Sequence, residues 1–256
     1  MSRRRLAAAA ALASPAALAA VVAAQVRSLV RGEFLDDPAF SVAAECEPPA
    51  PTDRLLRLAV LGDSTVAGIG ADEADGSLPV LVAERVARLA GCRVAVTGHG
   101  RSGARTADVR GEQVPVLADG DVDVALVVVG SNDVTHVTPP WRLAAETAAL
   151  VREAAARAGA VVLGGIPEFA TVPRFPQPLR AVAGAWADLL RAVQRRSALA
   201  AGALFVDIAA LASPRFLGRP ETMSADGYHP SAIGYGLWAD ALAPAVAALA
   251  GPRAAQ

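Results

Sequence analysis

The stretch LLRLAVLGDSTVAGIG, residues 55–70, places a mostly apolar run directly before the tripeptide Gly62-Asp63-Ser64. A short run that is apolar on both faces of an extended chain is typical of a strand buried in a parallel sheet. A serine just past such a strand lies either in a strand-ending turn or at a catalytic position, because Asp and Ser also hydrogen-bond to nearby backbone. The remaining sequence has to decide between these two interpretations.

Short apolar runs alternate with longer amphipathic segments from residue 55 onward. Strands covered on both faces by intervening helices indicate a doubly wound α/β domain, a three-layer fold around a parallel sheet of about five strands. We expect strands at about 55–61, 93–97, 122–129, 160–164 and 203–208, and helices at about 78–90, 106–118, 141–158, 179–199 and 231–249.

Composition limits the partners and cofactors. The chain of 256 residues is 54% hydrophobic and 19% charged, which is enough for one substantial core, and its formal net charge is −1. A nucleic-acid-binding domain is usually basic, so we expect no nucleic-acid partner. Cys46 and Cys92 are the two cysteines, and they form no recognised ligand spacing with the three histidines. We therefore predict no metal and no other cofactor, and the two thiols either pair or stay free.

The first 31 residues predict a signal peptide or an N-terminal membrane anchor. Arg3, Arg4 and Arg5 precede an uncharged stretch at 6–26, which as a helix would span about 31 Å, the thickness of a bilayer core. The stretch is rich in Ala and contains Pro15, so a cleaved signal and a retained anchor both stay open. We expect an exported protein, extracellular or attached to the outer face of the cytoplasmic membrane through residues 6–26.

Residues 32–53 are acidic and then rich in Pro, which predicts a linker. The compact domain then covers residues 54–251. Within it, four polar segments follow the predicted strands: Ser64 follows the first, 98–103 the second, 130–133 the third, and 226–230 lies between the fifth strand and the last helix. Because ligands bind outside the carboxyl ends of parallel strands, we expect these segments to meet at one edge.

The residue types in these segments suit acyl transfer. A Ser64 nucleophile needs a base that takes its proton, which we assign to His229, and Asp226 would orient and stabilise that imidazole. The backbone N–H of Gly103, the side-chain amide of Asn132 and the N–H of Ser64 are the predicted oxyanion donors. Together these five residues complete an acyl-transfer site.

Other candidates within the same segments are weaker. Residues 100–104, GRSGA, are one residue from the G-x-S-x-G nucleophile elbow, but that elbow normally follows several strands and here only one precedes it. Asp63 adjoins Ser64 in the chain, so we expect a structural role for it. His99 and His136 are either substrate contacts or loop histidines bonded to backbone, and we assign neither a role.

The four segments together resemble the SGNH (GDSL-type) hydrolase family over about residues 55–250. The resemblance lies in Gly62-Asp63-Ser64, Gly103, Gly130-Ser131-Asn132-Asp133 and Asp226-Gly227-Tyr228-His229-Pro230, which occur in family order. Thr65 stands where the family name has Leu, and Gly98 stands where an Asn commonly opens the second block. The resemblance implies a flavodoxin-like three-layer fold and metal-independent hydrolysis of esters by an esterase or lipase.

The sequence thus predicts an exported serine esterase acting on a carboxylic ester of a lipid, an acylated glycan or another small molecule. Two alternatives stay open: an acyltransferase that uses the same residues, and a non-catalytic exported domain that binds a glycan or a lipid. The oligomeric state is also left open. We expect the pocket to be shaped by loops at 71–77, 134–140 and 166–178, and the three tryptophans to pack helices: Trp141, Trp186 and Trp238.

Overall fold

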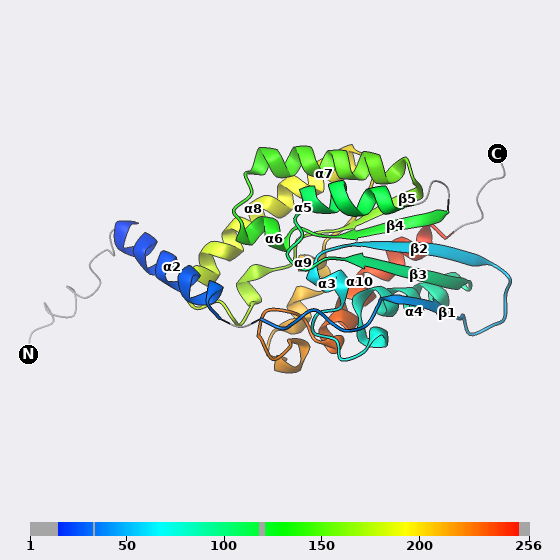
Figure 1. The fold of residues 1–256 in the computed structure, drawn as a ribbon, viewed down its shortest axis with the longest axis horizontal. Helices are drawn as coiled ribbons and strands as arrows, with labels where there is room; N and C mark the ends of the chain where they lie inside the picture. The colour runs from blue at the N-terminus through cyan, green and yellow to red at the C-terminus, as the bar shows by residue number, and fades with distance from the viewer. Residues whose placement is uncertain (1–14, 33, 118–120, 251–256) are drawn as a thin grey trace, which may run out of the picture.

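The computed structural model describes residues 15–32, 34–117 and 121–250 (Figure 1). In this part of the chain a six-stranded sheet runs in the order β1-β3-β2-β4-β5-β6. All neighbouring strands pair parallel except β1, which is antiparallel to β3. Without β1 the order is that of a flavodoxin-like sheet, which confirms the predicted fold class. The strands are β1 (Ala43–Cys46), β2 (Leu55–Gly62), β3 (Arg93–Gly100), β4 (Val122–Val128), β5 (Ala158–Gly164) and β6 (Leu204–Val206).

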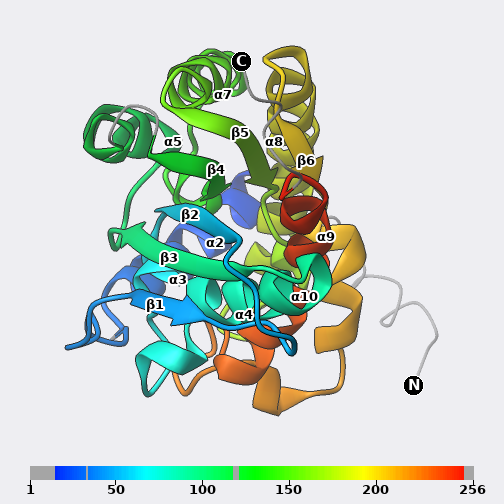
Figure 2. The same ribbon diagram turned by 90° about the vertical axis from the view of Figure 1, so that its right-hand side faces the viewer.

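Helices cover both faces of the sheet and complete three layers (Figure 2). Helices α4 (Leu78–Ala90) and α10 (Ala232–Ala248) pack on one face, and α7 (Pro140–Ala155) and α8 (Leu179–Ala200) pack on the other. The shorter helices are α3 (Ser64–Ala67), α5 (Thr106–Asp108), α6 (Ser131–Thr135) and α9 (Ile208–Leu211), and single 3₁₀ turns lie at Ala74–Gly76, Val114–Val116, Phe169–Thr171, Ser213–Phe216 and Pro220–Thr222.

Strand β2 lies at the centre and is buried on both sides. Leu58 and Val60 enter the core shared with α4 and α10, whereas Ala59 and Leu61 enter the core on the opposite face. This two-sided burial explains why the strand reads as an apolar run rather than as an alternating pattern. The strand order reverses between β2 and β4, so the ends of these two strands border the place where ligands bind in such sheets.

The predicted elements match the observed ones within three residues at each end, with one exception. The helix expected at 106–118 is instead three consecutive turns: α5, a π-helical turn at Val109–Gln113 and the 3₁₀ turn at Val114–Val116. Pro115 lies in the last turn and has no N–H, so it removes one hydrogen bond that an α-helical ladder would need there.

The sheet has one more strand than we predicted, because β1 forms inside the segment expected to be a linker. Its four residues, AAEC, contain no apolar run, and the strand owes its place to pairing along the edge of β3. Arg93 of β3 forms ion pairs with Glu45 and Glu47 across this edge. Cys46 of β1 and the buried Cys92 are both free thiols.

Helix α2 (Pro15–Val30) precedes the sheet and lies at the left end of the molecule in Figure 1. It begins at Pro15, a favourable residue for the first turn of a helix, and ends within the predicted targeting segment of residues 1–31, four residues after the uncharged stretch. The earlier part of the predicted targeting stretch, residues 6–14, lies outside the described residues. Among the described helices, none has the length and apolarity needed to cross a bilayer.

Two buried glutamines hold the strands where they separate at their carboxyl ends. Gln194 of α8 donates from Nε2 to the carbonyl of Val129 (2.8 Å) and accepts from the N–H of Ile166 (3.1 Å), so it bridges the ends of β4 and β5. Gln113 accepts from the N–H of Gly62 and donates to its carbonyl, both at 2.8 Å. These side chains supply hydrogen bonds that diverging strands can no longer give each other.

Replacing Gln194 by Leu should lower the free energy of unfolding by about 2 to 4 kcal/mol, because a buried N–H and a buried C=O both lose their partner. Urea denaturation measures this change. The matched control is Arg196→Leu on the exposed side of the same helix, for which we expect a change within about 0.5 kcal/mol. A Gln194→Leu protein as stable as the control would contradict this role.

Candidate active site

Ser64 is the first residue of α3 and lies two residues after Gly62, the last residue of β2. Asp63 caps this helix: its Oδ1 accepts from the N–H of Thr65 (3.0 Å) and from the Thr65 hydroxyl (2.9 Å). Burial raises the pKa of the Asp63 carboxyl above its usual value. Asp63 therefore has the structural role expected of it, because it fixes the turn that presents Ser64.

His229 lies between Ser64 and Asp226 and contacts both side chains. Its Nε2 is 3.0 Å from the Ser64 Oγ, and its Nδ1 is 2.7 Å from the Asp226 Oδ2. Ser64 and His229 are 7% and 5% exposed, so the contact between them is largely shielded from water. The structure thus brings together the three residues predicted as nucleophile, base and orienting acid, although 165 residues separate Ser64 from His229.

Backbone hydrogen bonds from the residues that follow Asp226 hold its carboxylate in place. Its Oδ1 accepts from the backbone N–H groups of Tyr228 (2.8 Å) and His229 (3.0 Å), while Oδ2 faces the imidazole. Burial alone would raise the pKa of this carboxyl, but the hydrogen bonds from His229 and Tyr228 outweigh it and lower the pKa to about 2. Asp226 is therefore ionised throughout the neutral pH range.

The predicted oxyanion donors Gly103 and Asn132 lie in two neighbouring turns that are bonded to each other. The Asn132 Nδ2 donates to the carbonyl of Ala104 (3.0 Å), the residue after Gly103. Gly103 is exposed and has a φ of +76°, a left-handed conformation that a residue with a side chain adopts only with strain. The Asn132 side-chain NH₂ group has two N–H donors. One of them bonds to the Ala104 carbonyl, and the second can donate to a ligand.

Further hydrogen bonds tie the turns together around Ser64. The N–H of Arg101 donates to the carbonyl of Gly62 (3.2 Å). The buried Asp133 accepts from the N–H of Thr106 (2.9 Å) and from its hydroxyl (2.8 Å). These bonds connect the ends of β2, β3 and β4, so the segments that carry Ser64, Gly103 and Asn132 form one unit.

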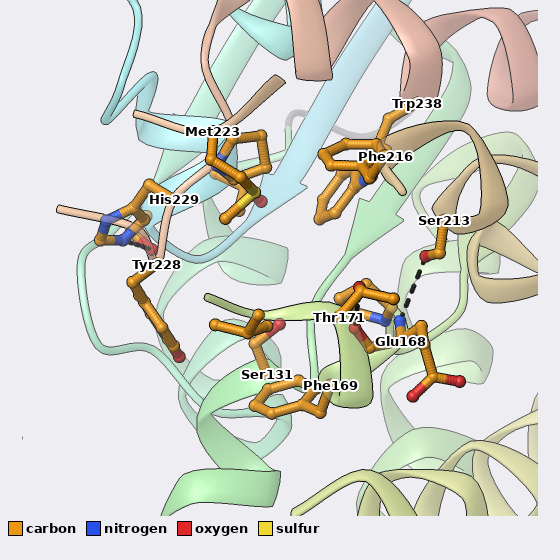
Figure 3. A pocket seen from close by; sticks show the side chains of 15 residues that line it. Ser131, Glu168, Phe169, Thr171, Ser213, Phe216, Met223, Tyr228, His229 and Trp238 are labelled. Carbon is orange, nitrogen blue, oxygen red and sulfur yellow. Dashed lines mark hydrogen bonds between the residues drawn. The ribbon is translucent and has the colours of Figure 1, made fainter. Parts of the chain in front are cut away.

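A cleft with about 530 Å³ of empty space, part of it open to solvent, lies beside Ser64 and His229. Figure 3 shows His229 and Tyr228 on one side of the view, Ser213 and Glu168 on the other, and Met223, Phe216 and Trp238 along the top. Of the three loops predicted to shape the pocket, only 166–178 contributes to the lining, and the rest of the wall comes largely from residues 213–238.

Several residues outside the predicted site contribute to it. Trp238 packs in the core, as predicted, but also lines the cleft, whereas Trp141 is 77% exposed and packs little.

Gln113 holds Gly62, two residues before Ser64. The sequence around Gln113 gives no signal for this role, because the residue follows Arg110-Gly111-Glu112 and its partner lies 51 residues away.

The two unassigned histidines differ in their surroundings. The exposed His136 contacts the carbonyl of Asn132 through Nδ1 (2.9 Å), as a loop histidine bonded to backbone would. Burial lowers the pKa of His99 below its usual value.

Among the described residues, no group of three or more His, Cys, Asp or Glu side chains is placed to hold a metal ion.

Comparison with known proteins places this arrangement in a family. Residues 60–237 match the model of the GDSL-like lipase/acylhydrolase family. A GDSL-like esterase of Mycobacterium tuberculosis is 35% identical over 189 residues, which are 73% of this chain but only 60% of that relative's length. A GDSL lipase of the same organism is 32% identical over 206 residues, 75% of this chain and 82% of the relative.

A solved structure has the same fold. The lipase/acylhydrolase of Enterococcus faecalis superposes with a TM-score of 0.60 at 22% identity, covering 78% of this chain and all of its own. The family match includes Ser64, Gly103, Asn132, Asp226 and His229, since all five lie within residues 60–237. From the sequence match and the shared fold together, this chain belongs to the GDSL-like lipase/acylhydrolase family.

Proposed function

We propose that this protein is a serine esterase that hydrolyses carboxylic esters through Ser64, His229 and Asp226. The observation that carries the proposal is the hydrogen-bonded series from the Ser64 Oγ through His229 to the Asp226 carboxylate, at the side of a cleft. A serine hydroxyl is a weak nucleophile until a neighbouring base takes its proton, and this series supplies the base together with the group that orients it.

In the first half of the reaction the Ser64 Oγ attacks the ester carbonyl carbon. A new C–O bond forms, and the hydroxyl proton passes to His229 Nε2, which lies 3.0 Å away. Asp226 faces Nδ1 at 2.7 Å, and its negative charge stabilises the imidazolium. His229 then gives the proton to the alcohol oxygen as the original ester C–O bond breaks, leaving an acyl group on Ser64.

In the second half a water molecule takes the place of the alcohol. His229 accepts a proton from the water as its oxygen attacks the acyl carbon, and then returns a proton to Ser64 Oγ when that bond breaks. In both halves a negative charge develops on the former carbonyl oxygen. The N–H groups of Ser64 and Gly103 and the Asn132 amide are the donors we assign to this charge.

The cleft wall suits the acyl part of the substrate. Apolar side chains dominate one side of it: in Figure 3 Met223 lies near His229, and Phe216 and Trp238 lie farther along the same wall. An apolar acyl chain placed there removes hydrocarbon from water, which contributes binding energy in proportion to the area buried. We therefore propose an ester with an apolar acyl group, as in a lipid or an acylated glycan.

We further propose that the enzyme acts outside the cytoplasm. Support comes from Arg3, Arg4 and Arg5 followed by an uncharged stretch at 6–26, the pattern of an export signal or anchor. Where the structure describes this stretch, Leu18 and Val21 of α2 are 43% and 46% exposed, so apolar side chains there are open to a lipid or a translocation machinery.

Replacing Ser64 by Ala should lower kcat/KM for a p-nitrophenyl ester by at least about a thousandfold, because the three residues act as a unit. The control is Ser102→Ala, which removes an exposed hydroxyl in the neighbouring turn and should leave activity within about twofold. Steady-state kinetics on both variants measure the difference. Comparable turnover by the Ser64→Ala and Ser102→Ala proteins would refute the proposed nucleophile.

Replacing Asn132 by Ala should lower kcat by about a hundred- to thousandfold and leave KM nearly unchanged, because the charge it meets exists only in the transition state. Asn132→Asp should be at least as damaging, since a carboxylate has no N–H to donate and repels the forming oxyanion. A rise in KM with kcat unchanged, in a protein with a native circular dichroism spectrum, would instead make Asn132 a ground-state binding residue.

Export is tested by fractionating cells that express the full chain with a C-terminal tag. We expect the domain in the medium or on the outer face of the membrane, where added protease degrades it in intact spheroplasts. The double variant Leu18→Arg, Val21→Arg places two charges in the uncharged stretch at exposed positions and should remain in the cytoplasm. Cytoplasmic location of the unmodified chain contradicts the proposal.

A further inference from the structure

The chain before β1 is bonded to the part of the molecule that carries the cleft. We call residues 15–32 and 34–42 the N-terminal arm; they precede the segment that matches the family. Gln25 of α2 donates from Nε2 to the carbonyl of Gln177 (2.7 Å) and accepts from the N–H of Leu179 (3.1 Å), which anchors α2 at the start of α8. Leu29 packs against the apolar cluster that contains Phe169 and Phe175.

The arm makes its second contact with the loop that carries the catalytic histidine. Phe34 meets the ring of Tyr228 edge-on, with centroids 5.5 Å apart and an interplanar angle of 80°. Tyr228 in turn meets the imidazole of His229 edge-on at 4.9 Å and 88°. Tyr228 also contacts Phe175 at 5.9 Å and lines the cleft. A continuous series of rings therefore leads from the arm to His229.

Arg174 strengthens the same contact from the other side. Its guanidinium lies 4.0 Å from the centroid of the Phe34 ring, a cation–π arrangement. The same side chain donates from Nη1 to the carbonyl of Asp226 (3.0 Å), and the Arg174 N–H donates to the carbonyl of Gly227 (3.0 Å). Phe34 thus touches two of the groups that contact the loop, the Tyr228 ring and the Arg174 guanidinium. A backbone bond from the Ser224 N–H to the His229 carbonyl (2.8 Å) holds the loop from its other side.

The position of this loop decides the position of the imidazole. The N–H groups of Tyr228 and His229 both donate to the Asp226 Oδ1, so the 226–229 turn is one hydrogen-bonded unit. Any shift of the unit moves His229 Nε2 relative to the Ser64 Oγ, which belongs to a different part of the fold. Phe34 is 44% exposed, so an aromatic side chain is kept partly in water at this contact.

We propose that Phe34 is a positioning residue: by packing on Tyr228 and under Arg174, it holds the 226–229 turn so that His229 stays aligned with Ser64. The inference rests on the proposed esterase function. It means that the segment preceding the family domain, which the sequence predicts to be only a targeting segment and a linker, also positions the loop of the active site.

The test compares Phe34→Ala with Phe34→Tyr in the full chain, with Trp141→Ala as the control for loss of an exposed aromatic side chain outside the cleft. Phe34→Ala should lower kcat for p-nitrophenyl butyrate by about tenfold with KM within about twofold, since displacing a catalytic group by 1 Å can cost about a hundredfold. Phe34→Tyr keeps the ring and should restore kcat to within twofold of the unmodified protein, while Trp141→Ala should not change it.

Amide hydrogen exchange gives a second readout that needs no turnover. In Phe34→Ala the N–H groups of Tyr228 and His229 should exchange about tenfold faster, while amides of β4 in the core keep their rates. If no ester is hydrolysed by the unmodified protein, the proposed function fails and exchange alone decides the positioning role. Unchanged exchange at both amides, or a kcat of Phe34→Ala equal to that of Trp141→Ala, overturns the inference.

Discussion

The close contact of Gly62 with the end of β4 is the constraint on which the site depends. A Cβ at Gly62 would lie 2.1 Å from the carbonyl oxygen of Val128, so any side chain there would force β2 and β4 apart. Those are the strands between which the order of the sheet reverses, and Ser64 follows two residues later. Gln113 then fixes both backbone groups of Gly62. Tight packing at this one residue places the nucleophile beside the turns that reach it from β3 and β4.

The parts of the fold that could be predicted are those with a local signal. Strand β2 is buried on both faces and therefore reads as an apolar run, and the polar residues that follow β2 and β4 fall at one edge because parallel strands end together. Strand β1 gave no such signal, because its four residues, AAEC, are too few to show an alternation of apolar and polar side chains. The strand forms because it pairs with β3. The roles of Gln113 and Gln194 also escaped prediction, because their partners lie 51 and 65 residues away.

The active site has two parts: one is positioned by the ends of the central strands, and the other is positioned by contacts to a loop. Ser64, Gly103 and Asn132 follow central strands whose ends are bonded to one another, and their geometry follows from the sheet. His229 and Asp226 lie in the loop between the 3₁₀ turn at Pro220–Thr222 and α10, which is outside the sheet and is closed by an isolated bridge between Met223 and Pro230. A few local backbone bonds, such as Ser224 N–H to the His229 carbonyl, position this second part together with side chains: the Asp226 carboxylate within the loop, and the Tyr228 ring with its aromatic neighbours around it. Because of this division, contacts to the loop can change the position of His229 without moving Ser64.

The antiparallel strand β1 also affects how the molecule behaves among its own copies. An open strand edge exposes unpaired N–H and C=O groups that can bind another chain, and the long strand β3 would offer eight residues of such an edge. β1 pairs with residues 94–97 at the middle of that edge and is itself only four residues long. At the opposite side β6 has three residues. Both borders of the sheet are thus too short to template a further strand, which protects the folded protein against edge-to-edge aggregation.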